Sequence, residues 1–236
     1  MRNVDYAGMF VKEFREALAE NPTAWVPIGL LEWHGEHIAL GCDLIGARES
    51  CRLLARTYGG IVLPPTYFSR PGFSAYEGTI DFPLEVAAPT LTALLQQLEK
   101  VGFKTAVLLS FHGGSVQEKM LALAREEYEK EGSIRVVTVI PFTLVAMPET
   151  SSHATPVETA VLRALCPEAV DVSRFTPAKE YPGTYELPGR SGLRTWRITD
   201  VDVRNAPLDA YAEEFLGKLV ERVGRLLDPT AAPDRE

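Results

Sequence analysis

The sequence lacks several features that would assign it to a common class of protein. No apolar run approaches the roughly 20 residues that a membrane span needs, and acidic side chains recur through the first 22 residues, where a secretion signal would be apolar. Lys and Arg number 24 against 32 Asp and Glu, a formal charge of −8, which disfavours binding to nucleic acid or to an anionic membrane. We therefore expect a cytoplasmic protein whose partner is a small-molecule substrate or a peptide.

Cysteine pairs and nucleotide-binding motifs are also missing. Cys42, Cys51 and Cys166 are the three cysteines and show no CxxC spacing, so neither a disulfide framework nor a thiolate zinc site is indicated. Cys42 is interpreted as a small packing residue. The chain contains no GxxxxGK[ST], GxGxxG or GxSxG segment, which removes the main support for P-loop, Rossmann and α/β-hydrolase interpretations.

Short apolar segments alternate with amphipathic helical patterns along the chain. Four apolar runs predict buried strands at 24–31, 59–65, 104–111 and 134–142. Helices are predicted at 5–20, from Asp43 onward, and at 91–103, 116–132, 156–165 and 207–227. This alternation predicts an α/β protein with three α/β/α layers and a mainly parallel central sheet. We expect one domain over residues 1–228 and a disordered tail over 229–236.

Residues 64–90 form the longest segment without a clear period. They are rich in Pro, Gly, Ser and aromatic residues, and a loop of that length is usually a functional lid or wall. Tyr67, Phe73 and Tyr76 are its candidate wall residues, and a role in core packing is equally open for them.

The four histidines of the chain all follow predicted strands. His34 and His37 come after the strand at 24–31, His112 ends the strand at 104–111, and His153 lies in the loop after the fourth strand. A lone histidine near a strand end is more often structural than functional. Ligands of open parallel sheets bind beyond the carboxyl ends of the strands, so four histidines at that edge favour a functional site.

Carboxylates accompany these histidines. Glu32 lies two residues before His34, Asp43 starts the next predicted helix, and Glu158 lies in the first turn of another. Imidazole and carboxylate groups bind Zn²⁺, Mn²⁺ and Fe²⁺. These residues provide enough ligands for one divalent ion, and two ions that share a carboxylate are feasible. The first-turn position of Glu158 also suits an acid that only stabilises its helix.

Three neighbouring positions carry further interpretations. His37 either contacts a metal or orients one of its ligands, whereas Glu36 is expected to face solvent. Gly113 and Gly114 form the turn "HGGS" between a strand and a helix, where backbone N–H groups can point into a cavity and bind a phosphate or an oxyanion.

Three separated motifs over residues 24–172 resemble those of the creatininase (creatinine amidohydrolase) family. They are "PIGLLEWHGEHIALGCD", "SFHGGS" and "SSHATPVETAVLRALCPEAVDV", and "YEGTID" is a weaker similarity. Together they contain every histidine of the chain. The resemblance implies a three-layer α/β/α fold, a homohexamer, and a two-metal centre that cleaves amide C–N bonds through metal-activated water.

The resemblance also assigns roles to individual residues. Glu32, His34, Asp43 and His112 correspond to metal ligands, with Asp43 bridging two ions. His153 matches the histidine that shuttles protons during ring opening.

One ligand of creatininase proper has no counterpart here. A glutamate binds the second metal in that enzyme, and Gly114 occupies the equivalent position. Either Glu158 or a water then completes the second site, or only one ion binds tightly.

The departures from the family pattern leave the substrate open. We expect a small amide, formamide or lactam-like compound, with Trp33 and Trp196 as candidate pocket residues. A peptidase-type member and a non-catalytic protein that binds a metal or ligand are the alternatives.

Overall fold

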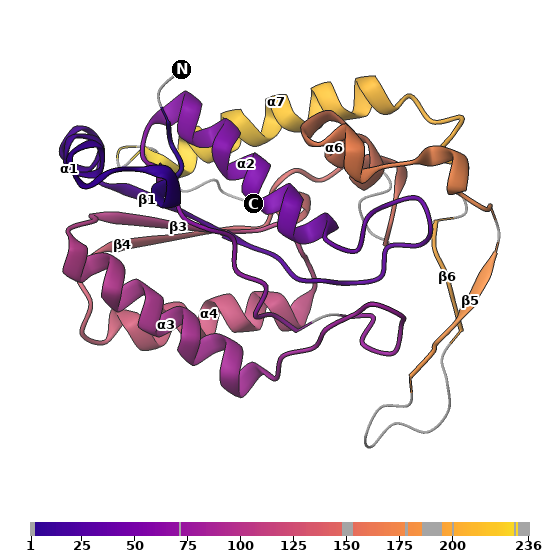
Figure 1. Ribbon diagram of the computed structural model, residues 1–236, viewed down its shortest axis with the longest axis horizontal. Helices are drawn as coiled ribbons and strands as arrows, with labels where there is room; N and C mark the ends of the chain where they lie inside the picture. The colour runs from indigo at the N-terminus through magenta and orange to yellow at the C-terminus, as the bar shows by residue number, and fades with distance from the viewer. Residues whose placement is uncertain are drawn as a thin grey trace.

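The computed structural model describes residues 3–70, 72–147, 153–177, 179–185, 195–199 and 201–228, together with Thr230. A central sheet lies between two layers of helices (Figure 1). None of the described helices is long and apolar enough to cross a membrane. The predicted tail over 229–236 falls outside the described residues, apart from Thr230.

The central sheet is parallel throughout. Its strands are β1 (Thr23–Ile28), β2 (Ile61–Val62), β3 (Thr105–Ser110) and β4 (Arg135–Val139), in the order β2-β1-β3-β4. The predicted mainly parallel sheet is therefore confirmed, although each strand is shorter than its apolar run. In the second run only two residues pair, and the prolines that follow at 64 and 65 lack the N–H needed to extend a ladder.

Alternating residues of the strands face opposite helical layers. Ala24, Val26 and Leu108 pack with α1 (Val11–Glu20), α3 (Leu84–Val101) and α4 (Ser115–Glu129). Trp25 and Leu109 pack with α2 (Cys42–Tyr58), α6 (Pro156–Leu165) and α7 (Leu208–Leu227). Apolar burial on both faces explains why the strands read as nearly continuous apolar runs, and it confirms the three-layer prediction.

Two predicted element boundaries are wrong. The first helix is divided into a 3-10 helix, η1 (Tyr6–Gly8), and α1. Helix α3 begins at Leu84, so the last seven residues assigned to the loop 64–90 are helical. Pro89 lies inside this helix and masked its start, because proline usually marks a break in a helical pattern.

Several short elements were not predicted from the sequence. Strands β5 (Glu180–Pro182) and β6 (Thr195–Arg197) form an antiparallel pair, and α5 (Pro141–Leu144) occupies the end of the fourth apolar run. Two further 3-10 helices, η2 (Pro167–Ala169) and η3 (Val172–Arg174), follow α6.

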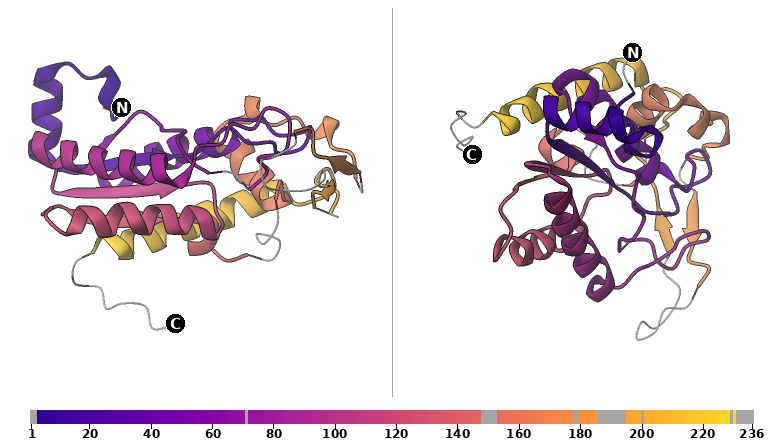
Figure 2. Two further views of the ribbon diagram at one scale, coloured as in Figure 1. Left: turned by 90° about the horizontal axis from the view of Figure 1, so that it is seen from below. Right: turned by 60° about the vertical axis from the view of Figure 1, so that its left-hand side comes forward.

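The loops after β1, β3 and β4 meet at one edge of the sheet because these strands are parallel. At the same end of the molecule lies the β5–β6 pair, opposite α1 (Figure 2, left). Gly29 lets α2 pack against the end of β1, since a Cβ there would lie 2.4 Å from the backbone of Leu44. The start of α2 is thereby held at the edge where the histidines gather.

Candidate metal centre

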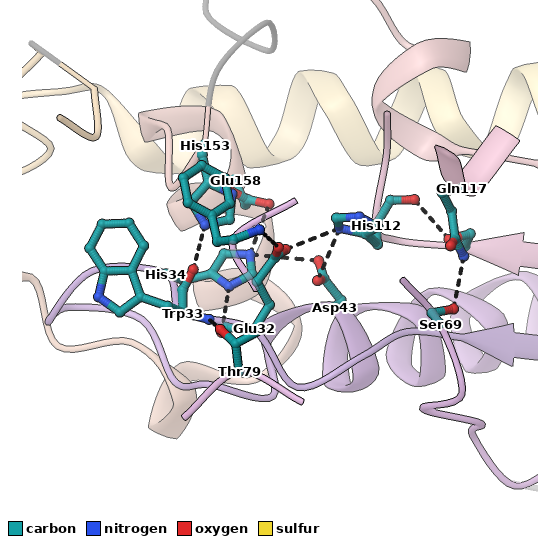
Figure 3. Close-up of polar contacts among 12 residues, drawn as sticks. Glu32, Trp33, His34, Asp43, Ser69, Thr79, His112, Gln117, His153 and Glu158 are labelled. Atoms are coloured by element: carbon teal, nitrogen blue, oxygen red, sulfur yellow. Dashed lines mark hydrogen bonds and ion pairs between the residues drawn. The ribbon is translucent and has the colours of Figure 1, made fainter. Parts of the chain in front are cut away.

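Residues from five segments converge at the carboxyl edge of the sheet (Figure 3). They are Glu32 and His34 from the loop after β1, Asp43 from the first turn of α2, His112 after β3, His153 before α6, and Glu158 from the first turn of α6. Glu32, His34 and Asp43 are at most 1% exposed. Parallel strands thus bring together residues up to 126 positions apart, as the sequence predicted for the histidines.

His34 faces two carboxylates. Its Nε2 lies 3.6 Å from Oδ1 of Asp43 and 3.5 Å from Oε1 of Glu158. The other ring nitrogen, Nδ1, donates a hydrogen bond to the backbone oxygen of Glu32 over 3.0 Å. This bond fixes the ring, and it leaves Nε2 directed at the two carboxylates.

His112 faces a second pair of carboxylates. Its Nδ1 lies 3.2 Å from Oε2 of Glu32 and 3.4 Å from Oδ2 of Asp43. The remaining oxygen of Glu32, Oε1, accepts a hydrogen bond from the backbone N–H of Phe73 over 2.8 Å. Asp43 therefore contributes one oxygen to each group, and the two groups share this carboxylate.

The donor atoms fit divalent ions. Oε2 of Glu32, Oδ2 of Asp43 and Oε2 of Glu158 are buried and accept no hydrogen bond from the described residues. The distances of 3.2–3.6 Å between nitrogen and oxygen match donors around a common ion, because tetrahedral bonds of about 2.0 Å separate their donors by about 3.3 Å. Imidazole and carboxylate ligands are those of zinc, manganese and iron sites.

Opposite charges on the side chains stabilise this buried cluster. Burial raises the pKa of Asp43, but the opposing effect of His34 and His112 is larger and brings the pKa below its usual range. Burial lowers the pKa of His112, while Glu32 and Asp43 raise it to about 10. The pKa of His34 is likewise raised, against the effect of burial, by Cys42, Asp43 and Glu158. The raised pKa values favour the positively charged imidazolium form of both His34 and His112. A metal ion can bind these rings only after the extra protons leave, so protons and a metal compete for the site.

His153 lies beside this centre in a different environment. Its ring stacks on Phe73 with centroids 3.9 Å apart and lies 4.3 Å from the ring of His34. Nε2 donates a hydrogen bond to the backbone oxygen of Trp33, which directs the lone pair to Nδ1. Burial, followed by the charge of His34, lowers the pKa of His153, so the ring is neutral near pH 7.

The two remaining polar residues of the first motif lie apart from the donor groups. His37 is buried, and its Nε2 lies 3.2 Å from Oγ1 of Thr159, next to Glu158 in α6. It therefore contacts the helix that carries a candidate ligand. Glu36 is exposed, as predicted, and forms an ion pair with Lys179 at 2.5 Å.

The glycine turn borders the centre. Gly114 is the N-cap of α4, with φ of 92°, and a Cβ built there has no atom within 4 Å. The positive φ explains a glycine at this position, and the open space beside it can admit part of a substrate.

The aromatic residues of the loop divide into two groups. Phe73 contacts His153 and Glu32, whereas Tyr76 is buried and stacks on Trp33 at 4.6 Å. Tyr67 is 39% exposed and packs against Phe68 and Phe82 instead. The side chain of Trp196 lies outside the described residues.

Sequence reasoning missed a buried polar network behind His112. Gln117 donates from Nε2 to the hydroxyls of Ser69 and Ser110, over 3.1 and 2.9 Å. Ser110 donates in turn to the backbone oxygen of His112 over 2.7 Å. Glutamine and serine carry no spacing signature for such a role, so only the helical register of Gln117, on the buried face of α4, could have indicated it.

The chain matches a known protein family over most of its length. The model of the family described as "Creatininase: Creatinine amidohydrolase" matches residues 7–222. A mycofactocin precursor peptide peptidase of Mycolicibacterium smegmatis is 23% identical over 218 residues, which cover 88% of this chain and 84% of the relative. A creatinine amidohydrolase of Pseudomonas putida is 23% identical over 182 residues, which cover 66% of this chain and 70% of the relative.

The fold is shared with solved structures. A mutant creatininase described as "Zn-Zn type" superposes with a TM-score of 0.71 at 19% sequence identity, covering 99% of this chain and 100% of that chain. At that identity the likeness supports the fold alone.

Proposed function

Since the chain belongs to the creatininase family, we propose that it is a metal-dependent amidohydrolase that cleaves a C–N bond of a small amide, formamide or lactam-like substrate. The shared carboxylate of Asp43 carries this proposal. One of its oxygens faces His34 and the other faces His112, inside a buried group of acids. A bridging carboxylate of this kind is typical of two-metal hydrolytic centres.

Three overlapping groups of possible donors lie in the centre, one of them formed by Glu32, His34 and His153, and the two groups that share Asp43 would hold two ions. His34, Asp43 and Glu158 form one group, and Glu32, Asp43 and His112 form the other. Glu158 would thereby supply the acid that Gly114 does not. When bound, Zn²⁺ or Mn²⁺ lowers the pKa of water and polarises a carbonyl group.

His153 would move the proton. Its hydrogen bond to the oxygen of Trp33 fixes the tautomer, and the stacked ring of Phe73 restricts its rotation. A neutral imidazole with a free Nδ1 accepts a proton from the attacking water and delivers it to the departing nitrogen. The lowered pKa of His153 favours this neutral form before the reaction.

The glycine turn would bind the carbonyl oxygen. Gly114 lies at the start of α4 beside open space, and its N–H and that of Gly113 would be the donors. Donors that are fixed before the reaction stabilise the negative charge that develops on oxygen, because they need not reorganise.

A peptide amide is the second candidate substrate. The peptide peptidase of Mycolicibacterium smegmatis aligns with 88% of this chain, whereas the creatinine amidohydrolase of Pseudomonas putida aligns with 66%. A substrate panel therefore has to contain creatinine, lactams, formamides and short peptides.

Substitution of one acid and one imidazole tests the proposal. We expect Glu32→Gln and His112→Ala to lose metal and to lower kcat/KM by more than the roughly 10–100-fold that loss of a supporting residue costs. The matched control is Glu36→Gln, because Glu36 is an exposed acid in the same loop. Metal content and hydrolysis of the panel are measured for all four proteins.

Two results would contradict the proposal in different ways. Retention of metal and activity by both variants would show that the centre is assigned to the wrong residues. Bound metal without turnover of any amide by the wild type would favour the non-catalytic alternative.

A further inference from the structure

We propose that the thiolate of Cys42 is an additional metal ligand in the group formed by His34, Asp43 and Glu158. The inference rests on the proposed metal centre and adds to it a sulfur donor. Neither the ligand set implied by the family resemblance nor the spacing of the cysteines indicates this residue.

The position of the thiol carries the inference. Sγ of Cys42, a ring nitrogen of His34 and carboxylate oxygens of Asp43 and Glu158 all lie within 4.8 Å of one another. Cys42 is the first residue of α2 and is fully buried. Neither Cys51 nor Cys166 belongs to a group of possible metal donors among the described residues.

A surrounding acid supplies a second, independent observation. Oε2 of Glu158, in the same group as Cys42, is buried without a hydrogen bond from any described residue, although burial of an unpaired carboxylate is costly. An ion between the carboxylates, the imidazole and the thiol would satisfy this group. Cys42 raises its donors from three to four, the number that tetrahedral zinc takes.

Binding changes the protonation of the ligands and not the oxidation state of the sulfur: His34 releases its extra proton to solvent, and Cys42 loses its thiol proton. The S–H bond breaks, its electron pair stays on sulfur and forms the bond to the metal, and the proton leaves to solvent. No oxidant or reductant takes part.

The two groups of the centre then differ in metal preference. A thiolate favours zinc or cadmium over manganese, whereas imidazole with carboxylates accepts all three. The group with Cys42 has four protein donors, while the group formed by Glu32, Asp43 and His112 has three. A catalytic ion keeps a position open for water or substrate. The group formed by Glu32, Asp43 and His112 would therefore hold the ion that activates water.

Cobalt substitution tests the sulfur ligand directly. Metal-free wild type, Cys42→Ser and the double variant Cys51→Ser/Cys166→Ser are loaded with Co²⁺ and examined for a thiolate-to-cobalt charge-transfer band in the near ultraviolet. The double variant keeps Cys42 as its only cysteine. It therefore gives a decisive result even where Cys42→Ser does not fold.

We expect the band in the wild type and in the double variant, and its loss in Cys42→Ser. We also expect Cys42→Ser to lower the ratio of zinc to manganese affinity by at least roughly tenfold, because loss of even a supporting residue costs 10–100-fold. Cobalt bound to the wild type without the band would overturn the sulfur ligand alone. Failure of the wild type to bind any cobalt would overturn the metal centre itself.

Discussion

Asp43 shows most clearly why this cluster requires a cation. Its side chain is 1% exposed, and transfer of a carboxylate from water into a protein interior costs several kcal/mol. Two imidazoles face its two oxygens, so in the absence of a metal the compensating charge comes from protons. Metal binding would replace those protons, and metal affinity should therefore fall as the pH falls.

His37 behaves in the opposite way because burial keeps it neutral. Burial lowers its pKa to about 4, against about 6.5 in an unfolded chain. Between these values the unfolded state binds a proton that the folded state does not bind. The stability due to neutral His37 is therefore complete above about pH 6.5 and is lost progressively toward pH 4, by up to about 3 kcal/mol.

The substitution His37→Gln tests this pH dependence. We expect the free energy of unfolding of the wild type to fall more steeply between pH 7 and pH 4.5 than that of the variant. Urea denaturation of both proteins across this range measures the difference, in which the contributions of other titrating groups cancel. Parallel curves for the two proteins would show that His37 is not held neutral.

At the scale of elements, the start of each helix and the loop before it position the site. Helix α2 delivers Asp43 and α6 delivers Glu158, each from its first turn. Helix α4 acts from behind the site, because Gln117 joins the loop residue Ser69 to Ser110 at the end of β3. The side chain of Gln117 therefore links the loop after β2 to the end of β3, the strand that precedes His112.

We expect Gln117→Leu to destabilise the protein by about 1–3 kcal/mol, because it removes two buried hydrogen bonds and leaves the serine hydroxyls under-satisfied. Gln96→Leu is the matched control, since Gln96 is exposed on α3. Urea denaturation compares both variants with the wild type. Equal stability of the two variants would mean that the network contributes nothing to the fold.

Local sequence signals predicted some elements accurately and others poorly. The helix predicted at about 156–165 is confirmed, and its start carries ordinary local signals: Pro156 begins it, and the side chain of Thr155 caps its first turn. The start of α3 was missed because Pro89 interrupts its pattern. Propensity also gave no sign of the bond from the backbone of Phe73 to Glu32, since a backbone N–H has no sequence signature.

At the scale of the whole molecule, topology determines the site. The order β2-β1-β3-β4 brings the ends of β1, β3 and β4 to one edge, so the convergence of the histidines could be predicted once the strands were taken as parallel. Which oxygen faces which ring could not be predicted, because it depends on the packing of α2 and α6. The homohexamer implied by the family resemblance stays a prediction, which size-exclusion chromatography with light scattering measures.

Metal stoichiometry in variants of the three acids tests the central claim most directly. Proteins are purified without chelators, checked for folding by circular dichroism and analysed for metal per chain by mass spectrometry. With Asp43 shared by two ions, the wild type and the control Glu36→Gln hold two ions, Glu32→Gln and Glu158→Gln hold one each, and Asp43→Asn holds neither. A folded Asp43→Asn variant that keeps as much metal as either single-group variant would contradict the shared carboxylate.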